Sequence, residues 1–120
     1  MNVLIVESDP SLGALWQRHL QRQGMGVRVE TSQSGAASAL NARRFDVIIL
    51  DVVLEQGSAL AVSDLASYRH PDTRVIFVTN SAFFSDGSIF AISQNACAFL
   101  QSDTPPEDLT AMVEHYGRLT

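Results

Sequence analysis

The sequence predicts an α/β fold: a doubly wound, five-stranded parallel sheet covered on both faces by five helices. Short β-branched runs alternate with longer segments of helical period, which is the pattern of a parallel sheet with helical crossovers. The run 47–50 is apolar throughout, as expected of a strand buried on both faces. With 120 residues, 46% of them hydrophobic and 18% charged, the chain has the size and composition of one domain. We therefore expect residues 1–120 to form a single three-layer sandwich.

The first helix has a clear start signal. Asp9 offers an N-cap oxygen and Pro10 fits the first helical position. Apolar residues then recur at helical spacing, with Trp16 among them, so this helix should pack one face on the core. Its end is expected near Gly24.

The other elements follow from the same patterns. Strands are predicted at 3–6, 27–30, 47–50, 74–79 and 97–100. Two further helices are predicted at 34–43 and 60–68, and a short one is entered at Ser85, Asp86 and Gly87. The last helix should open with a capping box formed by Thr104 and Glu107.

Composition excludes several classes of function. The net charge of -5 argues against contact with nucleic acid, and no run of eighteen apolar residues or signal peptide is present. The single Cys97 cannot form an internal disulfide. Three histidines lie too far apart for metal-ligand spacing and are predicted to be solvated: His19, His70 and His115. We expect a cytoplasmic domain whose partners are proteins.

Acidic and hydroxyl residues come directly after three of the predicted strands. Glu7, Ser8 and Asp9 follow the first strand, Asp51 the third and Thr79 ends the fourth. In doubly wound sheets, functional groups gather at the carboxyl ends of the strands. The three loops are therefore expected to converge on one site.

Three segments resemble the receiver domains of two-component response regulators. They are V-L-I-V-E-S-D-P-S-L near the start, F-D-V-I-I-L-D-V-V-L in the middle and R-V-I-F-V-T-N later. The resemblance covers essentially the whole chain and implies a flavodoxin-like, CheY-like sandwich with strand order 2-1-3-4-5. It implies a phosphorelay module, not an enzyme.

The resemblance also implies roles for individual residues. Asp51 matches the phosphoacceptor, a carboxylate nucleophile that receives a phosphoryl group from a histidine kinase or phosphotransfer protein. Mg²⁺ would be held by Glu7, Ser8, Asp51 and the backbone carbonyl of Val53. Thr79 matches the hydroxyl that contacts the phosphate and also acts in the switch, Phe99 matches the aromatic switch position, and Ser102 stands where the family has lysine.

Several positions depart from the family pattern. Ser8 replaces a carboxylate, so Mg²⁺ should bind weakly or not at all. Ser102 replaces an ammonium, and Asp103 would repel a phosphoryl group if it pointed inward, so phosphorylation should be slow or absent. Glu55 replaces a proline and Ala59 a glycine, which leaves Gly57 to adopt any positive φ that the turn requires.

Two hypotheses remain. The first is a phosphorylatable receiver that changes its affinity for an unidentified downstream protein. The second is a pseudo-receiver, which binds a partner through the face formed by its fourth helix, fifth strand and fifth helix without phosphorylation. A homodimer through the fourth and fifth helices is compatible with Phe83 and Phe84. An aspartate-based hydrolase is disfavoured, because Val53 stands where it would need a general acid.

Overall fold

The computed structural model describes residues 1–79 and 95–118, and its strands form one parallel sheet. The sheet order is β2-β1-β3-β4-β5, as the resemblance implied. Its strands are β1 (Asn2–Val6), β2 (Gly26–Glu30), β3 (Val47–Asp51), β4 (Arg74–Thr79) and β5 (Ala96–Gln101). Every neighbouring pair is parallel, β1, β3 and β4 occupy the interior of the sheet, and β2 and β5 are its edge strands.

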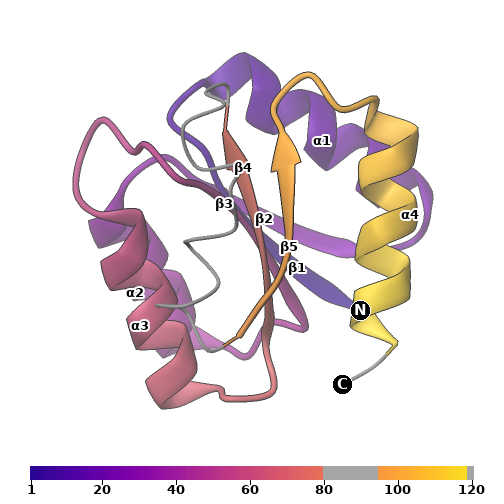
Figure 1. Cartoon of the computed structure of the whole chain (residues 1–120). Helices are drawn as coiled ribbons and strands as arrows, with labels where there is room; N and C mark the ends of the chain where they lie inside the picture. Colours follow the sequence, from indigo (N-terminus) through magenta and orange to yellow (C-terminus); the bar gives the residue numbers. More distant parts are fainter. Residues whose placement is uncertain (80–94, 119–120) are drawn as a thin grey trace.

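Helices cover both faces of this sheet (Figure 1). The described residues contain four of the five expected helices: α1 (Pro10–Arg22), α2 (Gln33–Ala42), α3 (Ala59–Arg69) and α4 (Pro106–Gly117). The short helix predicted from Ser85, Asp86 and Gly87 lies outside the described residues. None of the helices described is long and apolar enough to cross a membrane.

Alternating side chains of the central strands build two separate cores. Leu4 and Val6 belong to the core under α2 and α3, whereas Val3 and Ile5 belong to the core under α1 and α4. All four side chains are completely buried. β3 is buried in the same way from Val47 to Leu50, which confirms the prediction of a strand covered on both faces.

The start of α1 is capped as predicted. Asp9 Oδ1 accepts hydrogen bonds from the backbone N–H groups of Ser11, at 2.9 Å, and Leu12, at 3.4 Å. Pro10 occupies the first turn, where it removes an N–H group that would have no partner within the helix. This cap fixes the direction in which the chain leaves β1, and so it positions Glu7 and Ser8.

The predicted capping box at the last helix is wrong. Pro105 is the N-cap of α4, and no side chain caps this helix. Pro106 follows in the first turn, where a proline is tolerated because its missing N–H group would have no partner within the helix. The acidic Glu107 and Asp108 in the same turn complement the helix dipole. The two prolines move the helix start beyond the reach of Thr104.

The histidines are less exposed than predicted. His115 is exposed, but His19 and His70 are half-buried. His70 ends α3, and its Nε2 lies 3.2 Å from the backbone oxygen of Leu40. This contact joins the C-terminal end of α3 to the C-terminal end of α2. Both helix ends lie at the amino-terminal ends of the strands, away from the acidic loops, so His70 has a structural role there.

Candidate functional site

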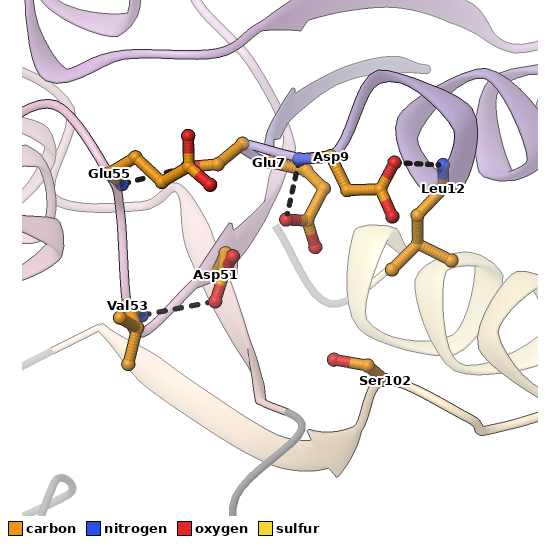
Figure 2. Close-up of a pocket in the computed structure, with 8 residues that line it drawn as sticks. Glu7, Asp9, Leu12, Asp51, Val53, Glu55 and Ser102 are labelled. Carbon is orange, nitrogen blue, oxygen red and sulfur yellow. Dashed lines mark hydrogen bonds between the residues drawn. The ribbon is translucent and has the colours of Figure 1, made fainter.

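The carboxyl ends of the strands surround a pocket of about 430 Å³. Of the described residues, eight line it: Glu7, Ser8, Asp9, Leu12, Asp51, Val53, Glu55 and Ser102. Figure 2 shows that the side chains of Glu7 and Asp51 face the same space, with Ser102 reaching it from the segment after β5. Five of the predicted site residues are therefore brought together, and Glu55 joins them unpredicted.

Glu7 is the most deeply buried of the acidic residues that line the pocket. It directly follows β1, and the whole residue is only 3% exposed. Its Oε2 accepts a hydrogen bond of 3.2 Å from the backbone N–H of Asp9. Burial and the neighbouring carboxylate of Asp51 together raise the pKa of Glu7 from 4.5 to about 8. Without a cation, Glu7 therefore holds a proton at neutral pH.

Asp51 is held in place at the end of β3. Its Oδ1 accepts a hydrogen bond of 3.0 Å from the backbone N–H of Val53. The N–H of Val52 binds the carbonyl of Val78 at 2.9 Å, which keeps the chain paired with β4 one residue beyond Asp51. The carboxylate is half-buried and borders the open pocket, so it is both positioned and accessible for nucleophilic attack.

Ser8 joins two loops of the site. Its Oγ accepts a hydrogen bond of 2.9 Å from the backbone N–H of Glu55, 47 residues away in the sequence. The loop after β1 is thereby tied to the loop after β3. Glu55 is exposed and lines the pocket, where its carboxyl group adds a further negative charge. In the sequence, Glu55 stands out only because it replaces the family's proline, and no pattern there predicts its hydrogen bond with Ser8.

Thr79 and Ser102 are adjacent through the backbone. The N–H of Ser102 donates to the carbonyl oxygen of Thr79 at 2.7 Å. Ser102 lines the pocket, whereas Thr79 is completely buried at the end of β4 and is not among the lining residues. Asp103 is exposed and also lies outside the lining, so the inward orientation considered for it is not found.

Phe99 and Gly57 are not among the residues that line the pocket. Phe99 is half-buried on β5, opposite Phe77, and packs on the core under α2 and α3. A bulge at Cys97 sets this register, because Val75 pairs with Ala96 but Ile76 pairs with Ala98. Gly57 has a φ of +108°, which confirms that it supplies the positive φ in the loop after β3.

Among the residues that the structure describes, the pocket lining contains four carboxyl groups and no basic side chain. The chain contains no lysine at all: its eight basic residues are arginines. Among the described residues, no three histidine, cysteine or carboxylate side chains are grouped to hold a metal ion. Glu7 and Asp51 nevertheless fit Mg²⁺, which commonly takes one or two carboxylates and several waters. The neighbouring carboxylate of Asp51 disfavours ionisation of Glu7, and a divalent cation would offset the repulsion between the two ionised groups.

Comparison with known proteins agrees with this geometry. The family model described as the response regulator receiver domain matches residues 3–114 of this chain. The nitrogen assimilation regulatory protein NtrX of Azorhizobium caulinodans is 27% identical over 116 residues, covering 94% of this chain and 25% of that protein. Response regulator protein PilR of Pseudomonas aeruginosa is 32% identical over 112 residues, covering 92% of this chain and 24% of PilR.

Solved structures give the same fold. A CheY-like response regulator receiver domain protein from Methanospirillum hungatei superposes with a TM-score of 0.88 at 19% identity, covering 98% of this chain and 94% of that one. Response regulator TrrA from Thermotoga maritima, solved in complex with Mg²⁺-BeF, superposes with a TM-score of 0.83 at 18% identity, covering 96% and 97%. The chain spans 25% and 24% of the lengths of NtrX and PilR. It belongs to the response regulator receiver domain family and is a module of two-component signalling.

Proposed function

We propose that Asp51 accepts a phosphoryl group from a histidine kinase or phosphotransfer protein, and that the modified domain signals through its affinity for another protein. The observation that carries this proposal is the placement of the Asp51 carboxylate beside Glu7 in an open pocket. A carboxylate oxygen of Asp51 would attack the phosphorus of a phosphohistidine. The P–N bond then breaks, an acyl phosphate forms on Asp51, and the imidazole leaves with its electron pair.

Glu7 and Asp51 would hold Mg²⁺ in this reaction. Bound Mg²⁺ supplies positive charge that offsets the charge on the transferring phosphoryl oxygens. Glu7 must release its proton before it can act as a ligand, and the N–H of Asp9 favours its ionised form. Ser8 and the carbonyl of Val53 complete the proposed ligand set. The TrrA complex with Mg²⁺-BeF is a precedent in this fold.

The rate of phosphorylation should be low. Ser102 offers a neutral hydroxyl at the lysine position, and the pocket lining described within residues 1–79 and 95–118 contains no basic side chain. Each phosphoryl transfer depends mainly on positioning and charge stabilisation, so the loss of one cation slows the step rather than changing its chemistry. The hydroxyl of Thr79 and the ring of Phe99 are the proposed switch groups.

Phosphoramidate, a small donor with a P–N bond, tests the proposal. With Mg²⁺ present, we expect the intact mass to increase by one phosphoryl group, and Asp51→Asn to show no increase. The Glu55→Gln variant is the matched control, since it removes a different pocket carboxyl and should still be modified. Equal modification of the wild type and Asp51→Asn would place the phosphoryl group elsewhere and contradict the proposal.

A second candidate is a pseudo-receiver that binds its partner without phosphorylation. The observation that favours it is the engagement of Ser8 Oγ by Glu55, which connects the site loops through neutral groups. This candidate predicts no mass change with phosphoramidate. It also predicts the same partner affinity for the wild type, Asp51→Asn and Asp51→Glu.

A further inference from the structure

The segment 52–58, here called the site loop, is held from two sides. It connects β3 to α3 and forms one rim of the pocket through Val53 and Glu55. On the side of α1, Ser8 Oγ accepts a hydrogen bond from the backbone N–H of Glu55. On the other side, the loop contacts Gln33, the first residue of α2.

Gln33 makes three contacts with the site loop. Its backbone N–H donates to the carbonyl of Gln56 at 3.0 Å, and its Oε1 accepts the backbone N–H of Ser58 at 2.8 Å. The Gln33 side chain also fills the space that a Cβ on Gly57 would need. Ser58 is in turn the N-cap of α3, its Oγ accepting from the N–H of Ala61. Gln33 therefore fixes both the Gly57 turn and the start of α3.

We propose that Ser8 and Gln33 are positioning residues that hold the site loop in place without a divalent cation. A cation on Glu7 and Asp51 would join the end of β1 to the end of β3. The Ser8 to Glu55 hydrogen bond makes a connection between the same two loops with uncharged groups, so it requires neither metal nor the ionisation of Glu7. Gln33 anchors the far end of the loop to α2, and the loop keeps one conformation whatever the state of Asp51.

The proposed role of Ser8 and Gln33 does not depend on phosphorylation. Its measurement reads the order of the loop, so it can fail while Asp51 remains a phosphoacceptor, and it can hold if Asp51 is never modified. Amide hydrogen exchange by NMR is suitable, because exchange at a hydrogen-bonded N–H requires local opening. The amides that report on the two side-chain hydrogen bonds are those of Glu55 and Ser58.

In EDTA, we expect the wild-type amides of Glu55 and Ser58 to be protected, and 10 mM Mg²⁺ to change their exchange by less than about twofold. Ser8→Ala should accelerate exchange at Glu55 by roughly 2- to 10-fold, and Gln33→Ala should do the same at Ser58, which corresponds to the loss of one hydrogen bond. Ser8→Thr and Gln33→Glu retain the acceptor oxygens and should restore protection. Ser11→Ala, on the exposed side of α1, is the control for a hydroxyl that does not contact the site loop.

Two results would overturn the proposal. One is a wild-type loop that exchanges freely in EDTA and becomes protected only when Mg²⁺ is added. The other is unchanged exchange at Glu55 in Ser8→Ala and at Ser58 in Gln33→Ala. If Ser8→Ala or Gln33→Ala folds poorly, Ser8→Thr and Gln33→Glu provide the test. Loss of the wild-type protection in either of these conservative variants would contradict the proposal equally.

Discussion

The carboxyl groups of Glu7 and Asp51 line the same pocket, and burial together with the neighbouring carboxylate of Asp51 raises the pKa of Glu7 to about 8. At neutral pH Glu7 therefore holds a proton beside the proposed site of phosphorylation. The arrangement is stable without a metal, but it must give up the proton before both carboxylates can bind a cation. Proton release, cation binding and phosphorylation are therefore linked at this pair.

Glu7→Gln should flatten the dependence of stability on pH. Between pH 4.5 and 8 the folded wild type retains a proton on Glu7 that the unfolded chain releases, so its free energy of unfolding falls as pH rises through this window. We expect Glu7→Gln to lose this decline of roughly 2–4 kcal/mol. Urea unfolding at pH 5 and pH 8.5 in EDTA measures it. Glu55→Gln, in the exposed rim, should keep the decline, and an equal effect of both variants would refute the assignment.

Ser8→Asp should strengthen Mg²⁺ binding. A third carboxylate beside Glu7 and Asp51 adds an oxygen ligand and a negative charge, and we expect the affinity to rise roughly tenfold. Isothermal titration calorimetry at pH 7.5 provides the comparison. Ser11→Asp adds the same charge nearby but outside the pocket lining, so it should have a much smaller effect. If both variants bind equally well, the gain comes from net charge and not from coordination.

Ser102→Lys should accelerate phosphorylation of Asp51. The new ammonium would reach the pocket from the position of Ser102 and pair with the phosphoryl oxygens, and we expect a gain of roughly tenfold or more. The initial rate of modification by phosphoramidate, followed by intact mass, is the measurement. Gln101→Lys places the same charge on the exposed preceding residue and serves as the control. No gain with Ser102→Lys would mean that Ser102 does not face the transferred group.

Gly57→Ala should destabilise the domain more than Gly24→Ala. Both glycines have positive φ, at +108° and +82°, so both substitutions strain the backbone. A Cβ at Gly57 would also collide with Gln33, whereas a Cβ at Gly24 meets no atom within 4 Å. We expect a cost of about 1–3 kcal/mol at Gly57 and about 1 kcal/mol at Gly24, measured by urea unfolding. Equal costs would show that Gln33 does not confine the turn.

The sheet could be predicted from the sequence because its signals are local. Uninterrupted apolar runs such as 47–50 are expected only where both faces of a strand are covered, and Asp9 with Pro10 marks the start of α1 by short-range chemistry. The convergence of Glu7 and Asp51 follows from topology, since the carboxyl ends of parallel strands lie at one edge.

The contacts that complete the site could not be predicted in this way. The hydrogen bond between Ser8 and Glu55 joins residues 47 positions apart, and neither residue type indicates a loop contact. Gln33 is an ordinary polar residue at a helix start, and its role depends on where α2 places it. The error at Thr104 has a similar origin, because the conformation of two consecutive prolines overrides a spacing that otherwise favours a capping box.

Beryllofluoride binding tests the central claim most directly. BeF₃⁻ mimics a phosphoryl group on an aspartate, and NMR spectra of the ¹⁵N-labelled domain with Mg²⁺ report its effect. We predict saturable binding with amide shifts at Asp51, Thr79 and Phe99 in the wild type, and none in Asp51→Asn. The contrary result is that neither the wild type nor Asp51→Asn shows amide shifts at millimolar Mg²⁺ and beryllofluoride. It would contradict phosphorylation at Asp51 and leave the pseudo-receiver.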